Sequence, residues 1–351
     1  MTRILIAIAA VLFLGVTDQA SAASVFRLKA DCAVIGDGVA DDTAAIQACI
    51  ANAQVSGGVI IAEIGDYKTT SCLSVTKTIT IQGQGYAGHR QYPAAINASV
   101  FRPTANFLCV ASNTPVFLER FQIHYAPGVN TAKGIILDGS GGTLSYNTDS
   151  IIRDVFIINA NQCVVSVNVS RLRFDNNTLE GCGQVSMITA HVANPDGGDS
   201  FIANNTFSGQ PTFAHLLYIS GGALRIINNK FNGGGNAAIY ILPDPCSGNP
   251  PLAGFGGPFI TGNSIEGTPY GMIVQQQPGC ENARLDLLHV VGNEFGATLK
   301  GIWFRDGSIS GGWIRTVTVG LNTFIGMGAT NSIVIDPNSV TNTQIGLNAI
   351  H

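Results

Sequence analysis

The stretch LRFDNNTLEG (172–181) returns as SFIANNTFSG (200–209) and again as LRIINNKFNG (224–233). In each copy an asparagine stands two positions before one large apolar residue and three positions after another. The same register holds in seven copies, whose asparagines are 24 to 34 residues apart: Asn177, Asn205, Asn229, Asn263, Asn293, Asn322 and Asn348. A phrase that repeats at such intervals predicts stacked structural units, and the region over about residues 150–350 is their array.

A third short segment of alternating apolar residues lies between consecutive copies, as in Leu217-Tyr218-Ile219 and Ile302-Trp303-Phe304. Such alternation predicts a strand with one buried face. Three short strands per repeat describe one rung of a parallel β-helix, with rungs about 4.8 Å apart. We therefore predict an all-β, single-stranded right-handed parallel β-helix with a capping helix at its N-terminal end. A β-sandwich, the alternative, needs longer strands and hairpin turns.

The repeated asparagines predict a ladder at a buried turn. There the backbone bends and cannot pair with a neighbouring strand, so an inward amide is expected to bond to the backbone and to the asparagines of adjacent rungs. Asparagine also tolerates left-handed backbone angles. The aromatic residues that follow predict a stacked core column: Phe207, Phe231, Phe295 and Phe324.

Composition excludes several classes of protein. Of the 351 residues only 11% are charged, 46% are hydrophobic and 42 are glycines, which excludes an intrinsically disordered chain. The net charge of −4 is spread without basic runs, so no nucleic-acid partner is expected.

The N-terminus has the pattern of an export signal. Arg3 precedes an apolar run from Ile4 to Val16, and Ala20-Ser21-Ala22 offers a small-residue cleavage site. We predict a signal peptide over residues 1–22, a single β-helix domain over 23–351 and a secreted or periplasmic protein. No membrane association is expected after cleavage, because no later segment is long and apolar enough to span a bilayer.

Eight cysteines follow the export signal, and none forms a CxxC pair. Their even number predicts disulfides and no metal site. Cys246 with Cys280, and Cys163 with Cys182, are the pairs expected from their positions. The partners of the others are not predicted: Cys32, Cys49, Cys72 and Cys109.

The segment GDGVADDTAAIQACI (36–50) predicts a turn followed by a helix over about residues 41–53. Asp42 is the expected N-cap, and Ile46, Cys49 and Ile50 form an apolar stripe that would cover the open end of the coil. Over about residues 30–85 the chain resembles the N-terminal signature of the pectate lyase superfamily. The resemblance implies the β-helix fold and carbohydrate-active chemistry, without choosing among lyases, hydrolases, epimerases and non-catalytic members.

One active site of this superfamily is not carried over. Polygalacturonase-type hydrolases have Asn-Thr-Asp, Asp-Asp, Gly-His-Gly and Arg-Ile-Lys motifs. Here Asn147-Thr148-Asp149 precedes the Ile151 strand instead of ending a strand, and the Asp41-Asp42 pair belongs to the predicted helix. The last two motifs are absent from the sequence.

In similar proteins the substrate lies along the strand that precedes the loop before the asparagine turn. Alternation there predicts that Ile239, Ile241, Ile302 and Phe304 point inward. Two outward columns follow. The first is Asp138, Asn168, His191, Ser220, Leu242, Gln275, Arg305 and Asp336, and the second is Ile136, Ser166, Thr189, Tyr218, Tyr240, Ile273, Trp303 and Val334.

These columns supply the candidate substrate-binding residues Tyr218, Tyr240, Gln275 and Trp303. Exposed aromatic rings suit stacking on sugars, although loops could instead cover them as a small satellite core. Arg305 could neutralise a uronate, and the alternative is an ion pair between Arg305 and Asp336 on neighbouring rungs.

Two kinds of catalytic centre fit the same columns. Asp244 and Asp306 are expected two rungs, or about 9–10 Å, apart, which is near the carboxylate separation of inverting glycosidases. A lyase needs a base and a cation. His191, Tyr218, Tyr240 or His215 could be that base, with Arg305 as the cation.

The sequence thus predicts a secreted protein that cleaves an acidic, uronate-containing polysaccharide as a lyase or a glycoside hydrolase. The alternative is a non-catalytic carbohydrate-binding or surface-structural β-helix. No cofactor is predicted, and a calcium requirement has no supporting motif. The partner expected is the polysaccharide itself.

Overall fold

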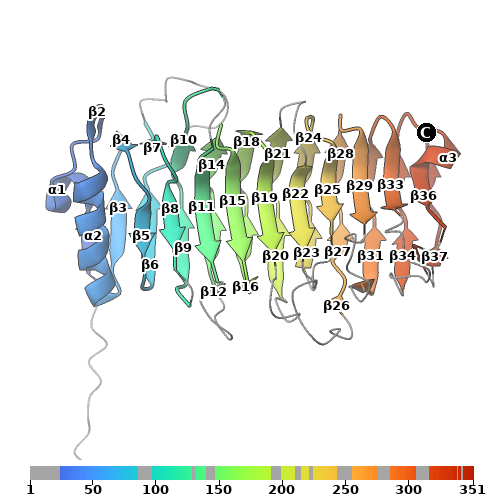
Figure 1. The fold of residues 1–351 in the computed structure, drawn as a ribbon, viewed down its shortest axis with the longest axis horizontal. Helices are drawn as coiled ribbons and strands as arrows, with labels where there is room; N and C mark the ends of the chain where they lie inside the picture. The colour runs from blue at the N-terminus through green and yellow to red at the C-terminus, as the bar shows by residue number, and fades with distance from the viewer. Residues whose placement is uncertain are drawn as a thin grey trace, which may run out of the picture.

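The computed structural model describes residues 24–85, 97–111, 113–128, 131–139, 147–190, 199–209, 215–220, 224–242, 255–275, 285–305, 316–337, 339–340 and 343–351. These residues form the predicted right-handed parallel β-helix (Figure 1). Ten rungs contribute one short strand to each of three long sheets, the first and last described rungs contribute to two of them, and the strands pair in parallel with those of the rungs before and after.

Sheet A holds the strand before each asparagine turn: β1 (Val25–Arg27), β3 (Val59–Ala62), β6 (Ile79–Gly83), β9 (Val116–Glu119), β13 (Ile151–Arg153), β17 (Arg173–Asp175), β20 (Ser200–Ala203), β23 (Leu224–Ile227), β27 (Phe259–Thr261), β31 (Leu288–Val291), β34 (Val317–Gly320) and β37 (Thr343–Ile345).

Sheet B holds the strand after the turn: β2 (Asp37–Asp41), β4 (Gly65–Thr69), β7 (Ser99–Pro103), β10 (Gln122–His124), β14 (Phe156–Ile158), β18 (Thr178–Cys182), β21 (Thr206–Gly209), β24 (Lys230–Asn232), β28 (Ser264–Glu266), β32 (Glu294–Gly296), β35 (Thr323–Phe324) and β38 (Ala349–Ile350).

Sheet C, which faces the viewer in Figure 1, holds the third strand: β5 (Leu73–Val75), β8 (Leu108–Val110), β11 (Lys133–Asp138), β15 (Gln162–Val167), β19 (Val185–Ala190), β22 (His215–Ser220), β25 (Ala237–Ile241), β29 (Tyr270–Gln275), β33 (Lys300–Arg305) and β36 (Ile333–Ile335). Two short pairs lie outside these sheets, namely β12 (Asn147–Thr148) with β16 (Val169–Ser170), and β26 (Phe255–Gly256) with β30 (Leu285–Asp286).

The asparagine ladder is present in all seven predicted copies. The Oδ1 atom of Asn263 accepts hydrogen bonds from the backbone N–H and the side-chain Nδ2 of Asn229, both at 2.9 Å. Its own Nδ2 donates to the Ile226 carbonyl and to the Oδ1 of Asn293. The same inter-rung bonds run from Asn177 to Asn348. At six buried turns the asparagine amides thereby bond to backbone groups that have no partner in a neighbouring strand.

The left-handed conformation belongs to the residue before each of the first six ladder asparagines, so the expectation for the ladder residues themselves was wrong. That preceding position has φ between 54° and 69° in Asn176, Asn204, Asn228, Gly262, Gly292 and Leu321. Five of these six are asparagine or glycine, which tolerate the conformation. Leu321 does not share that tolerance, and its side chain is 69% exposed.

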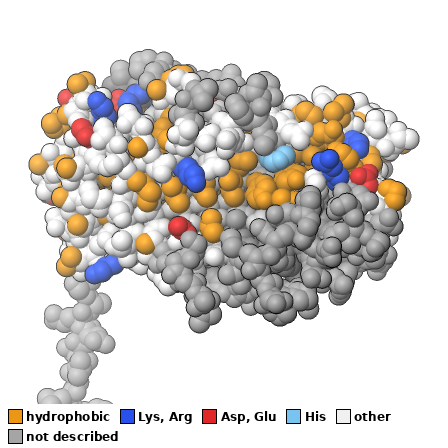
Figure 2. All heavy atoms as spheres, in the orientation of Figure 1, with side chains coloured by type: hydrophobic (Ala, Val, Ile, Leu, Met, Phe, Trp, Pro, Cys, Tyr) orange, Lys and Arg blue, Asp and Glu red, His pale blue; other side chains and the backbone are white. Residues whose placement is uncertain are grey.

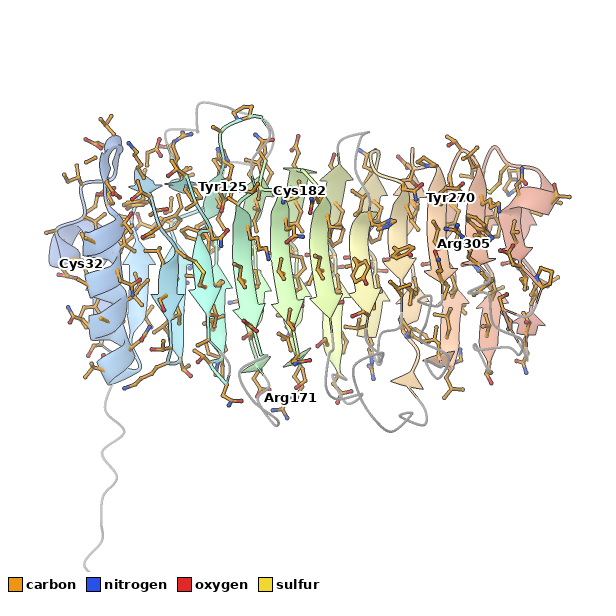
Figure 3. The ribbon with its side chains drawn as sticks, viewed as in Figure 1. Cys32, Tyr125, Arg171, Cys182, Tyr270 and Arg305 are labelled. Carbon is orange, nitrogen blue, oxygen red and sulfur yellow. A yellow bond between two sulfur atoms is a disulfide. The ribbon has the colours of Figure 1, made fainter. Side chains whose placement is uncertain are left out.

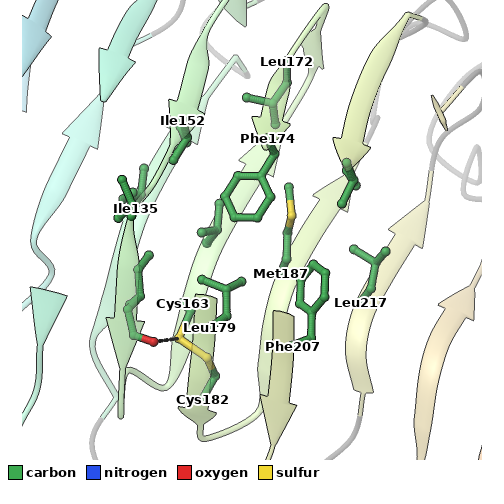
Figure 4. Packing of buried hydrophobic residues seen from close by; sticks show 14 of the residues in the cluster. Ile135, Ile152, Cys163, Leu172, Phe174, Leu179, Cys182, Met187, Phe207 and Leu217 are labelled. Carbon is green, nitrogen blue, oxygen red and sulfur yellow. Dashed lines mark hydrogen bonds between the residues drawn. A yellow bond between two sulfur atoms is a disulfide. The ribbon is translucent and has the colours of Figure 1, made fainter. Parts of the chain in front are cut away.

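The interior of the coil is filled with stacked apolar columns (Figure 4). Phe207 and Phe231 stack with ring centroids 4.8 Å apart, and Phe295 and Phe324 stack at 5.2 Å, as predicted. Ile265 separates these two pairs in the same column. The inward residues expected on sheet C are also buried, since Ile239, Ile241, Ile302 and Phe304 are at most 1% exposed.

The predicted N-terminal helix is present as α2 (Thr43–Ser56), which follows the short α1 (Leu28–Cys32) at the first rungs (Figure 1). Ile46, Cys49 and Ile50 are buried in the common core. Asp42 stands at the predicted N-cap position, although its side chain makes no bond to the helix. Its carboxylate accepts the backbone N–H groups of Ile35 and Gly36 instead, which fixes the preceding turn. A further short helix, α3 (Ala329–Ser332), lies near the C-terminus.

Three disulfides join cysteines of the described residues: Cys32–Cys49, Cys72–Cys109 and Cys163–Cys182. The third is one of the two predicted pairs, and it links β15 to the end of β18 (Figure 4). The first ties α1 to α2. Cys246 and Cys280 lie outside the described residues, as does the predicted signal peptide over 1–22.

Asn263→Ala removes one ladder amide and leaves the buried N–H groups of Asn229 without their acceptor. Each buried unsatisfied polar group costs about 1–3 kcal/mol, so we expect a loss of about 3–5 kcal/mol in the free energy of unfolding. Chemical denaturation measures it. Asn232→Ala, an exposed position on the neighbouring strand β24, is the matched control. Equal stability of the two variants would contradict a ladder that holds the rungs together.

Leu321→Asn places in the last left-handed position the residue found there in earlier rungs. A left-handed backbone costs most residues about 1–2 kcal/mol, and the exposed leucine side chain contributes little packing. We expect the variant to be about 1 kcal/mol more stable in thermal unfolding. Leu347→Asn, at an 86% exposed residue with an ordinary φ, should bring no such gain.

Candidate functional site

The outer face of sheet C carries three columns of side chains, fixed by the strand register. The middle column, Ile136, Val165, Ile188, Tyr218, Tyr240, Ile273, Trp303 and Val334, is apolar or aromatic at every rung. Figure 2 shows it as a band of hydrophobic side chains across this face, with basic side chains beside it toward the C-terminal end. At about 4.8 Å per rung the column is about 34 Å long.

The predicted register of this face was wrong by one residue on strands β15 and β19. Ser166 and Thr189 belong to the inward column and are buried. Each hydroxyl is bonded to a carbonyl of the next rung, that of Ile188 and that of Tyr218. Buried hydroxyls of this kind are stable because the adjacent rung supplies an acceptor.

The same shift corrects the column predicted to hold His191. Val167 and Ala190 pair with Asp138 and Ser220, so they occupy the places expected for Asn168 and His191. His191 itself lies outside the described residues. The rest of that column holds where the register is described, since Gln275 pairs with Arg305.

Tyr240 is the centre of the first cluster on this face. The imidazole of His215 stacks on its ring with centroids 4.0 Å apart and planes 2° apart, and the Tyr218 ring lies 5.7 Å away. The Tyr240 hydroxyl donates to Oε1 of Gln275 at 3.1 Å. All three rings are half-buried, so each keeps part of its surface open to solvent.

Trp303 is the centre of the second cluster. Lys300 Nζ lies 3.4 Å from the centre of the indole, the Arg305 guanidinium lies 5.1 Å from it, and the Tyr270 ring is 5.3 Å away. The indole Nε1 donates to Asp336 at 3.0 Å. Figure 3 shows Tyr270 and Arg305 on neighbouring strands of this face. Cations over an aromatic ring are attracted by its π-face, which holds both charges in place.

Gln275 joins the two clusters. Its Oε1 atom accepts from the Tyr240 hydroxyl and, at 3.2 Å, from Nη1 of Arg305. Arg305 is exposed, so its charge faces the solvent beside the aromatic rings. We call this network the sheet C strip: His215, Tyr218, Tyr240, Tyr270, Gln275, Lys300, Trp303 and Arg305.

Burial sets the protonation of the strip. Desolvation lowers the pKa of His215 to about 4, so its imidazole is neutral at neutral pH. Its Nδ1 atom is buried and has no hydrogen-bond partner among the described residues. Burial raises the pKa of Tyr240, and the nearby charge of Arg305 opposes that shift only in part. The phenol is therefore protonated at neutral pH.

The structure thus brings together six predicted site residues: His215, Tyr218, Tyr240, Gln275, Trp303 and Arg305. Asp244 and Asp306 lie outside the described residues, and their separation stays a prediction. The sequence reasoning missed Tyr270 and Lys300. Both stand at the start of their strands, three positions before Ile273 and Trp303, and they pair with each other. Reading the whole strand, and not only its last residues, would have found them.

Within the described part of the chain no three His, Cys, Asp or Glu side chains are grouped as a metal site would need. No described helix is long and apolar enough to cross a membrane.

Comparison with known proteins shows the fold. No family model matches the sequence, and no curated protein matches it either. Solved structures do match. The catalytic unit of a thermostable GH87 alpha-1,3-glucanase from Streptomyces thermodiastaticus strain HF3-3 has a TM-score of 0.58 at 18% identity, covering 94% of this chain and 69% of that one.

DFA-IIIase from Arthrobacter chlorophenolicus A6 in complex with GF2 has a TM-score of 0.58 at 14% identity, covering 94% and 98% of the two chains. A variant of that enzyme in complex with DFA-III has a TM-score of 0.59, also at 14% identity. At such identities the likeness establishes the parallel β-helix. The more specific resemblance to pectate lyases stays a prediction.

The lowered pKa of His215 predicts a pH dependence of stability. Between about pH 6.5 and pH 4 the unfolded chain binds a proton that the folded chain does not, so folded stability falls as the pH is lowered through that window. His215→Gln removes this group and should make the profile of unfolding free energy against pH less steep there, while His124, whose burial also lowers its pKa to about 4, keeps contributing to the slope. Denaturant titrations at half-unit pH steps measure it. Parallel profiles for the variant and the wild type would contradict a neutral, buried imidazole.

Proposed function

We propose that this protein binds and cleaves a uronate-containing polysaccharide along the sheet C strip. The observation that carries the proposal is the continuity of the strip, in which half-buried aromatic rings on the four adjacent strands β22, β25, β29 and β33 lead to two cations held in place on β33. Sugar rings present apolar faces that stack on aromatic side chains, while their carboxylates need fixed cations. The carbohydrate-active names of the structural neighbours support a glycan substrate.

Arg305 and Lys300 are suited to the carboxylate of the sugar. Gln275 fixes the guanidinium of Arg305 from one side, and the indole of Trp303 lies against both cations. A cation positioned in advance stabilises negative charge that develops next to the carboxylate without reorganising during the reaction. This is the electrostatic requirement of a lyase.

His215 is better suited than Tyr240 to accept a proton. A base has to be unprotonated at working pH, and burial keeps the imidazole neutral while it keeps the phenol protonated. Tyr240 lies between this base and the cation, because it stacks on His215 and bonds to the amide that holds Arg305. In β-elimination the base takes the proton next to the carboxyl group, and the electron pair expels the glycosidic oxygen. His215 stands three rungs, about 14 Å, from Arg305, so the sugar that it would deprotonate is not the sugar whose carboxylate Arg305 binds. His191 is the further candidate base.

Hydrolysis is the other reaction kept in the proposal. Asp244 and Asp306 remain its candidate acid and base, and the glucanase neighbour supports this chemistry. Binding without cleavage is a second candidate function. This second function is favoured by the hydrogen bond from the Trp303 indole to Asp336, because the Asp336 carboxylate then serves to position the indole. The export predicted from the sequence belongs to the same proposal, and the three disulfides support an oxidising compartment.

A panel of polygalacturonate, alginate, α-1,3-glucan and dextran tests the function. A lyase yields products that absorb in the ultraviolet, and a hydrolase yields reducing ends without that absorbance. Trp303→Ala should lower kcat/KM at least about tenfold because it removes the stacking surface and releases both cations. His215→Gln should lower kcat about 10²- to 10⁴-fold if it is the base.

Val334→Ala is the control for the strip, since it lies in the same column one rung beyond Trp303 and outside the network. Binding of a panel member without either product would favour the non-catalytic function. Wild-type activity of the Trp303 variant would exclude the strip as the site of cleavage.

A further inference from the structure

A second elongated hollow lies on a different flank, the outer face of sheet A. Two cavities of about 610 and 460 Å³ adjoin there and share Asp199 in their walls. The first extends from Phe117 to Phe201, and the second extends from Arg225 to His289. Figure 3 places Arg171, which lines the first cavity, at the margin of the coil away from Tyr270 and Arg305. We call the two cavities together the sheet A groove.

The floor of the groove is one column in strict register, formed on successive rungs by Arg173, Phe201, Arg225, Phe259 and His289. Arginine and phenylalanine therefore alternate from Arg173 to Phe259, about 4.8 Å apart. Phe201 is 36% exposed and Phe259 is 42% exposed, and Leu287 beside them is 52% exposed. Large apolar side chains this open, gathered in one hollow, indicate a binding surface.

Two charged side chains of the groove, Arg225 and Asp199, form no ion pair among the described residues. Asp149 is paired with Arg171 at 2.7 Å, and Asp175 lies 3.5 Å from Arg173 and accepts from Asn204. Among the described residues Arg225 makes no ion pair, and its guanidinium lies 5.1 Å from the centre of the Phe201 ring. A guanidinium placed in this way can bind a carboxylate with two parallel hydrogen bonds.

Geometry separates the classes of occupant. An extended peptide adds to a sheet edge, but the strands beneath the groove, β13 to β31, are paired on both sides. An amphipathic helix needs a continuous apolar surface, whereas this floor alternates arginine with phenylalanine. A linear polysaccharide matches the groove, because its apolar ring faces suit the phenylalanines, its hydroxyl groups suit the aspartates and its carboxylates suit the arginine.

We propose that the sheet A groove is a second polysaccharide-binding site, separate from the strip, which takes an acidic glycan with sugar rings on Phe201 and Phe259 and a carboxylate on Arg225. It rests on the proposed function only for the class of polymer. The ion-paired carboxylates of Asp149 and Asp175 accept hydrogen bonds from sugar hydroxyls, and no bond is broken here. The groove would hold a long chain on a flank that the strip does not reach.

Affinity electrophoresis of the full chain in gels that contain polygalacturonate or dextran tests this site. Phe259→Ala and Arg225→Ala should each weaken binding to polygalacturonate about tenfold, because one loses a stacking surface and the other a charged hydrogen bond. Arg225→Lys should bind between the wild type and Arg225→Ala. Gln344→Ala, an exposed residue of the same column beyond the groove, should bind as the wild type does. Thermal unfolding checks that each variant is folded.

The outcomes distinguish this inference from the proposed function. Binding that depends on Phe259 and Arg225, without any product from the panel, would support the groove and reject cleavage. Product formation that depends on Trp303, with wild-type binding by the Phe259 and Arg225 variants, would reject the groove and keep the function. If Arg225→Ala weakened binding to dextran, which has no carboxylate, as much as binding to polygalacturonate, the role given to Arg225 would be overturned.

Discussion

The asparagine ladder is the interaction on which the rest of the molecule depends. Each of the five interior amides, from Asn205 to Asn322, accepts two hydrogen bonds from the rung before and donates to that turn and to the rung after, so none of them can shift without leaving buried groups unpaired. The penalty for such groups is what makes the turn position rigid. Because the turn is fixed, the strands on either side of it keep one register over many rungs, and inward side chains superpose.

The ladder constrains the side chains that point into the coil, but it does not constrain which residues stand on the outer faces of the sheets. A strand places alternate side chains on opposite faces, so each inward column that the core demands comes with an outward column that it does not. The outward residues still inherit the alignment. On sheet C this aligns Tyr240 with Ile273 and Trp303, and on sheet A it aligns Phe201 with Arg225 and Phe259. Aligned rows of outward side chains can therefore differ on two flanks without changing the packing of the core.

The sequence predicted those features that depend on a repeated constraint. Asn205, Asn229 and their equivalents carry the fold because a buried amide can replace missing strand pairing, and a pattern of this kind is legible without coordinates. Aromatic residues of the strip followed from counting along a strand. The count failed at Ser166 and Thr189, because a hydroxyl that bonds to the next rung is as stable inside as an apolar group. Polarity alone therefore does not tell inward from outward.

Contacts between rungs are the part that counting could not supply. The stacking of His215 on Tyr240, and the bond from Arg305 to Gln275, join residues 25 and 30 positions apart whose side-chain directions depend on packing. These contacts decide the chemistry. The ring of Tyr240 and the surrounding burial keep the imidazole neutral, while Trp303 and Gln275 hold positive charge three rungs away. A neutral base and a fixed cation on one rigid face are stable together because the ladder, and not the site, sets the distance between their strands.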